Sequence, residues 1–136
     1  MILADASAWV GHLARRDARL VQHLAENRVV TCDVVVGALL LARGLPAELF
    51  RHLAVLPRLP CPGAAETGAF IERHRDVLRK AGADWTQAEV LLTALTAGAT
   101  LFTADPALAS AWSRLTGTHG REHPWKAASK APSEPS

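Results

Sequence analysis

The sequence lacks a long apolar run, a basic leader and a cysteine framework. No apolar stretch approaches the roughly 18 residues that a membrane-spanning helix needs. The opening residues, Met1 to Asp5, carry no basic charge, so we expect no secretory signal peptide. The two cysteines, Cys32 and Cys61, do not have the spacing of metal ligands, and we expect buried free thiols in a reducing compartment. These absences predict a cytoplasmic protein without membrane association.

The composition suits one globular domain. Of the 136 residues, 49% are hydrophobic and 21% are charged, which is enough to bury one core and too little charge for a disordered chain. The net charge of +2 permits a nucleic-acid partner, but the basic residues are scattered rather than clustered. Beyond residue 116 the apolar periodicity stops. We therefore expect a folded domain over 1–116 and a disordered tail over 117–136.

Short apolar runs alternate with stretches of helical periodicity along the domain. This alternation predicts an α/β fold with a short parallel sheet and helices on both faces. Strands are expected at 2–4, 29–31, 55–56 and 100–103. Helices are expected at 7–13, 18–26, 34–42, 46–53, 64–80, 85–97 and from 106 onward.

Helix-capping signals mark several of these boundaries. Asp33 is placed as an N-cap and Gly44 as the C-terminal signal of the helix between them. Asp84 and Gln87 match the capping-box pattern, in which each side chain bonds the backbone of the other residue. Asp105 precedes a proline, which favours the first position of a helix.

Two acids follow predicted strands, where open parallel sheets build their sites. Asp5 ends the first strand and Asp105 follows the strand at 100–103. If they converge, two carboxylates and several waters could hold Mg²⁺, and a metal-bound water could attack a phosphodiester. In the alternative interpretation each acid caps the helix that follows it, because Asp is common before helices.

Three segments together resemble the VapC-type PIN toxins of bacterial toxin–antitoxin systems. The first is Met-Ile-Leu-Ala-Asp-Ala-Ser-Ala-Trp-Val at 1–10, similar to the opening strand, acid and serine of that family. The second is Val-Thr-Cys-Asp-Val-Val-Val-Gly-Ala-Leu at 30–39, and the third is Leu-Phe-Thr-Ala-Asp-Pro-Ala-Leu at 101–108. The likeness covers about residues 1–115 in the order and spacing of the family.

The resemblance implies a fold, a chemistry and partners. The fold would be a PIN-like three-layer sandwich, and carboxylates would bind Mg²⁺ or Mn²⁺ and hydrolyse RNA. Asp5 and Asp105 would be catalytic metal ligands, with Ser7, Thr103 and Gln87 around them, although the two hydroxyls could equally serve as local caps. The partners would be a cognate antitoxin and a second copy of the chain, for which the apolar helices at 34–42 and 46–53 are candidate surfaces.

Two departures from the family pattern fall at acidic positions. The family usually has Glu where this chain has Ala38, and Asp where it has Gln87. The formal charge of such a site would fall from about −4 to about −2, which weakens the attraction for a cation. Helical periodicity argues against replacement by neighbouring acids, because Asp84 is engaged as a cap and Glu89 lies on another face.

Three functions therefore remain open. The first is a VapC-like, metal-dependent endoribonuclease with a depleted acidic site. The second is a catalytically weak or inactive PIN domain that keeps binding to an antitoxin, another partner or RNA. The third is an unrelated α/β domain whose acids only cap helices. Ribonuclease activity that EDTA abolishes would separate the first from the others.

Overall fold

A computed structural model describes residues 1–117 of the chain. Of the predicted tail, Gly117 is the C-cap of the last helix, and 118–136 lie outside the described residues. Within residues 1–117 the chain forms four strands: β1 (Ile2–Ala4), β2 (Val29–Cys32), β3 (Arg58–Leu59) and β4 (Thr100–Phe102). Eight helices connect and follow them: α1 (Ala6–Ala14), α2 (Ala18–Ala25), α3 (Asp33–Leu41), α4 (Ala47–Val55), α5 (Ala64–Arg73), α6 (Arg75–Ala81), α7 (Trp85–Ala97) and α8 (Pro106–Thr116).

The strands form one parallel sheet in the order β3-β2-β1-β4. Both central strands are buried along their whole length, as strands covered on two faces must be. Leu3 of β1 stands opposite Val30 of β2 on one side and Leu101 of β4 on the other. The predicted α/β class with a short parallel sheet is confirmed.

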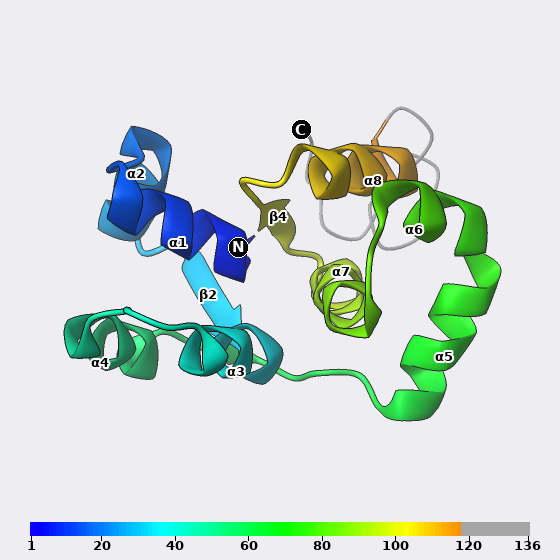
Figure 1. The fold of residues 1–136 in the computed structure, drawn as a ribbon, viewed down its shortest axis with the longest axis horizontal. Helices are drawn as coiled ribbons and strands as arrows, with labels where there is room; N and C mark the ends of the chain where they lie inside the picture. The colour runs from blue at the N-terminus through cyan, green and yellow to red at the C-terminus, as the bar shows by residue number, and fades with distance from the viewer. Residues whose placement is uncertain (118–136) are drawn as a thin grey trace.

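Two groups of helices cover the sheet. The chain steps from β1 to β2 to β3 through α1–α4, and then crosses back through α5–α7 to β4 at the opposite edge. Crossover connections between parallel strands are right-handed. Helices that connect strands toward the β3 edge therefore lie on one face of the sheet, and those on the return to β4 lie on the other. In Figure 1 the first four helices lie to the left and the last four to the right, with β2 and β4 near the centre.

The core is aliphatic and continuous through these layers. The largest side chains that are fully buried include Leu3, Leu20, Leu39, Leu53, Leu91 and Leu108, which come from one strand and five helices. Burying such side chains is the dominant favourable term for a domain of this size. Within residues 1–117, no helix is both long and apolar enough to cross a membrane.

One predicted strand is wrong in position. The strand expected at 55–56 is instead the end of α4, and Val55 is 79% exposed. The strand begins after Pro57, whose carbonyl accepts the Thr31 N–H at 3.0 Å. Proline has no N–H to donate, so the start of an edge strand suits it.

The single helix expected over 64–80 is two helices. The backbone turns out of helical geometry at His74, with φ −116° and ψ 30°. The break lets α5 pack against α7 while α6 packs against α8. Periodicity alone did not predict this change of direction, because buried apolar residues such as Phe70 and Leu78 keep helical spacing across the break.

The capping signals have mixed outcomes. Asp33 is the first residue of α3 rather than its N-cap, and its carboxylate pairs with Arg58 of the neighbouring strand. Gly44 lies in the left-handed region at φ 77°, but α3 has already ended at Ala42, so the glycine serves the following loop. The capping box of Asp84 and Gln87 is confirmed, and α7 ends at Gly98, which lies in the left-handed region at φ 69°.

The contribution of the Asp17 N-cap to the stability of α2 can be tested by substitution. The Asp17 carboxylate accepts the backbone N–H groups of Arg19 and Leu20, and the Arg19 side chain, the main cause, holds the pKa of Asp17 below its usual range. We expect Asp17→Ala to lower the free energy of unfolding by about 1 kcal/mol at pH 7. A lowered folded-state pKa stabilises the protein above the unfolded pKa and ceases to do so as pH falls through the folded value.

The loss caused by Asp17→Ala should therefore persist at pH 5 and shrink only below about pH 4. Urea denaturation at several pH values measures it. Asp17→Asn is the matched control, because Asn keeps a neutral oxygen that caps the helix but lacks the charge. It should retain part of the stability at pH 7 and should not share the loss below about pH 4. A constant difference between wild type and Asp17→Ala down to pH 2 would contradict the charged role of the cap.

Candidate functional site

The register of two neighbouring strands brings Asp5 beside Thr103. Ala4 at the end of β1 stands opposite Phe102 at the end of β4, so the next residues of the two strands are also opposite. The Asp5 N–H still bonds to the Phe102 carbonyl at 3.1 Å, which extends the ladder by one residue. The carboxyl ends of the strands thus place a carboxylate next to a hydroxyl, as expected for an open parallel sheet.

The Asp5 carboxylate is buried and accepts three hydrogen bonds. It is only 6% exposed. Its Oδ1 accepts from Ser7 Oγ at 2.7 Å and from the Ala8 N–H at 2.9 Å, and its Oδ2 accepts from Thr103 Oγ1 at 2.6 Å. A carboxylate offers about four lone-pair positions, so one acceptor position remains. These bonds replace the water that burial removes from the charged group.

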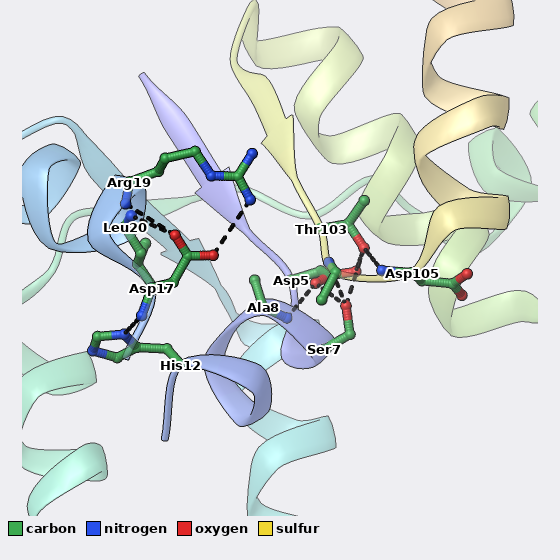
Figure 2. Close-up of polar contacts among 10 residues, drawn as sticks. Asp5, Ser7, Ala8, His12, Asp17, Arg19, Leu20, Thr103 and Asp105 are labelled. Atoms are coloured by element: carbon green, nitrogen blue, oxygen red, sulfur yellow. Dashed lines mark hydrogen bonds and ion pairs between the residues drawn. The ribbon is translucent and has the colours of Figure 1, made fainter. Parts of the chain in front are cut away.

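The two hydroxyls link Asp5 to the loop after β4. Each has one proton, and both protons are donated to the carboxylate, which leaves their lone pairs to accept. Ser7 Oγ accepts the Ala104 N–H at 3.0 Å, and Thr103 Oγ1 accepts the Asp105 N–H at 3.1 Å. Ser7 Oγ and Thr103 Oγ1 are themselves 3.0 Å apart. This Asp5–Ser7–Thr103 network holds together the ends of β1 and β4 and the start of α1 (Figure 2).

Asp105 is joined to the network through its backbone, and its side chain caps α8. Its Oδ1 accepts the N–H of Ala107 at 2.9 Å and of Leu108 at 3.4 Å. In Figure 2 the Asp105 carboxylate points away from the Asp5 carboxylate. The capping interpretation therefore describes the geometry of Asp105, whereas Asp5 combines an N-cap with a buried polar network.

A pocket of about 220 Å³ opens beside Asp5. Helices α3 and α7 approach each other here, and they bring Ala38 and Gln87 to the same pocket as Asp5. Asp105 is described by the structure but does not line this pocket. The full lining is Asp5, Ala6, Ser7, Val34, Val35, Ala38, Asp84, Thr86, Gln87, Val90 and Leu108.

The pocket includes one acid that the sequence argument assigned only to capping. Asp84 Oδ1 accepts the Gln87 N–H at 2.8 Å, and Gln87 Oε1 accepts the Asp84 N–H at 3.1 Å. The capping box thus engages the side-chain carbonyl oxygen of Gln87 and one oxygen of Asp84. Asp84 nevertheless lines the pocket together with Asp5. Its place at the start of the same helix as Gln87 was the available signal, because one turn separates the two residues.

The residues present fit a resident Mg²⁺ or Mn²⁺ poorly. Two acids line the pocket, and each already accepts hydrogen bonds from neighbouring groups. Within residues 1–117, no three His, Cys, Asp or Glu side chains gather closely enough to hold a metal ion. Mg²⁺ requires near-octahedral oxygen ligation, usually with one or two carboxylates free to coordinate.

A scan of the chain against protein-family models gives no match, and a search of curated proteins gives no significant match. A proposal about the function of the chain therefore stands on the three resembling sequence segments and on the residues of the pocket.

The hydrogen bond from the Thr103 hydroxyl to the Asp5 carboxylate can be tested by substitution. Thr103→Val keeps the shape of the side chain but removes both the donor to Asp5 and the acceptor for the Asp105 N–H. Hydrogen bonds to charged groups contribute about 1.5–3 kcal/mol, so we expect a loss of about 2 kcal/mol in the free energy of unfolding. Urea denaturation measures the loss.

Thr103→Ser provides the matched comparison, because serine keeps the hydroxyl and deletes only a methyl group. It should retain most of the stability that valine loses. Equal destabilisation by serine and valine would assign the effect to packing rather than to the bond with Asp5.

Proposed function

We propose that this chain is a VapC-like domain of the PIN type whose depleted acidic pocket leaves it a weak or inactive endoribonuclease. The resemblance over 1–115 suggests the class, and one structural observation carries the rest. Positions 38 and 87 meet Asp5 at a single pocket, as acids of a metal-dependent nuclease would have to, but they hold Ala and Gln. The pocket thus lies where a nuclease would bind a metal ion, but two of the side chains there cannot serve as acidic ligands, and the proposal follows from both facts.

The chemistry of the pocket supports binding more than catalysis. Metal-dependent hydrolysis requires carboxylates that hold the ion and orient the attacking water. Ala38 supplies no polar atom, and the Gln87 carbonyl oxygen is neutral and already bonded to the Asp84 N–H. We therefore propose weak affinity for Mg²⁺ or Mn²⁺ and a role that depends on binding an antitoxin-like protein or RNA.

Restoring the two acids tests this proposal directly. Ala38→Glu combined with Gln87→Asp should tighten Mn²⁺ binding by about tenfold or more, since two negative charges are added beside Asp5. Cleavage of a fluorescent single-stranded RNA should rise with it and should be abolished by EDTA. Titration calorimetry measures the binding, and Gln87→Asp alone should cost about 1 kcal/mol or less of stability through the capping box.

Two controls make the result specific to the pocket. Gln87→Glu keeps the reach that the capping box needs while adding the charge, so it separates loss of the cap from gain of a ligand. Adding Asp5→Asn to the restored variant should reverse the gain. Full EDTA-sensitive cleavage by the wild type, unchanged by Asp5→Asn, would show that the chemistry lies elsewhere.

The expected homodimer belongs to the same proposal. Helices α3 and α4 expose large apolar side chains: Leu41 is 87% exposed, Val55 79% and Leu40 63%. Exposed groups of this kind mark surfaces that associate, and two-fold symmetry is the commonest arrangement of identical chains. We expect light scattering to find a dimer whose dissociation constant Leu41→Lys raises about tenfold or more, while Glu72→Lys, an exposed control on α5, leaves the dimer intact. A wild-type monomer at high concentration would contradict this part of the proposal.

A further inference from the structure

The register of the β2–β3 edge brings together the only two cysteines of the chain. Cys32 ends β2 and stands opposite Leu59 of β3. Both Leu59 and Cys61 precede prolines, and a residue before proline is confined to extended backbone. Residues two apart in an extended segment project to the same side, so Cys61 faces the same way as Leu59 and its partner Cys32.

The side chains complete this placement. The Cys61 side chain lies near enough to Cys32 to raise the pKa of the Cys32 thiol. Cys32 is fully buried, whereas Cys61 is partly exposed, which corrects the expectation that both are buried. The arrangement therefore couples an accessible sulfur to an inaccessible one. Pro60 and Pro62, on either side of Cys61, restrict the backbone of this segment.

We propose that Cys32 and Cys61 form a reversible intramolecular disulfide on reaction with a low-molecular-weight disulfide. This inference does not depend on the proposed function. The partly exposed Cys61 reacts first: its thiolate attacks one sulfur of the small disulfide, forms a mixed disulfide and releases one small thiolate. The Cys32 thiolate then attacks the Cys61 sulfur and releases the second small thiolate. The two cysteine protons pass to the released thiolates, and the cysteine pair loses two electrons to the small molecule.

The environment of Cys32 suits attack on the mixed disulfide at Cys61 rather than attack on the small disulfide in solution. Burial is the main cause that raises the pKa of its thiol to about 11; the Val35 backbone lowers it, and the neighbouring Cys61 raises it again. A buried thiol of this kind is inert toward reagents in solution but reacts with a partner sulfur held against it. The order of attack therefore begins at Cys61.

The disulfide would close the segment that contains α3 and α4. That segment joins the pocket directly, because Val34 and Val35 follow Cys32 and line the space beside Asp5. The same edge is already joined by the ion pair between Asp33 and Arg58. A covalent link at this point restricts the unfolded chain and so stabilises the folded one.

The test uses the full chain, reduced and then exposed to oxidised glutathione under native conditions. Free thiols are alkylated, and intact mass with peptide mapping identifies the products. We expect the wild type to lose two hydrogens and to yield a peptide linking Cys32 to Cys61. The oxidised protein should melt about 10 °C higher than the reduced protein, and a thiol reductant should reverse the shift.

Single variants separate the two steps. Cys32→Ala and Cys32→Ser should both stop at a glutathione adduct on Cys61, because the second sulfur is missing. The pair guards against misfolding of either variant at this buried position, which far-UV circular dichroism checks. Cys61→Ser should remain unmodified. The proposal is overturned if the wild type itself stops at the Cys61 adduct, forms a disulfide between two chains, or stays unmodified where Cys32→Ala reacts.

Discussion

The site depends on one buried carboxylate at the end of β1. Asp5 has lost nearly all contact with water, and a charge in that position is tolerable only when donors replace the solvent. Ser7, Ala8 and Thr103 supply those donors, and they come from the start of α1 and from the end of β4. The need to satisfy one charge thus fixes the relative positions of two loops that are almost a hundred residues apart in sequence.

The same network limits the chemistry of the pocket. Each hydrogen bond that Asp5 accepts uses a lone pair that a metal ion would otherwise occupy. In a site with four acids, one well-bonded carboxylate leaves others free to coordinate. Here Ala38 and Gln87 line the same pocket as Asp5, and Asp84 is held in a capping box. The hydrogen bonds of Asp5 therefore stabilise the ends of β1 and β4 and leave few carboxylate oxygens to bind a cation.

The β3 edge of the sheet, opposite β4, also relies on side-chain interactions. β3 is only two residues long, so backbone pairing alone holds it weakly. The ion pair of Asp33 with Arg58 adds a side-chain link across the same two strands, and Cys61 lies near Cys32 beside it. This edge is the point where the chain leaves β2 for α3, and α3 forms one wall of the pocket.

The sequence by itself determined the α/β class, the parallel sheet and most helix boundaries, because alternating short apolar runs and helical stripes depend on local periodicity. It also indicated the capping box at Asp84 and the cap at Asp105, which are made by residues within three positions of each other. Only the tertiary structure decided which acids share a pocket. Strand register sets Thr103 beside Asp5, and helix packing sets Asp84 and Gln87 near Ala38, whereas Asp105 turns toward its own helix. Contacts of this kind join residues that are distant in sequence, and local patterns carry no information about which of them will meet.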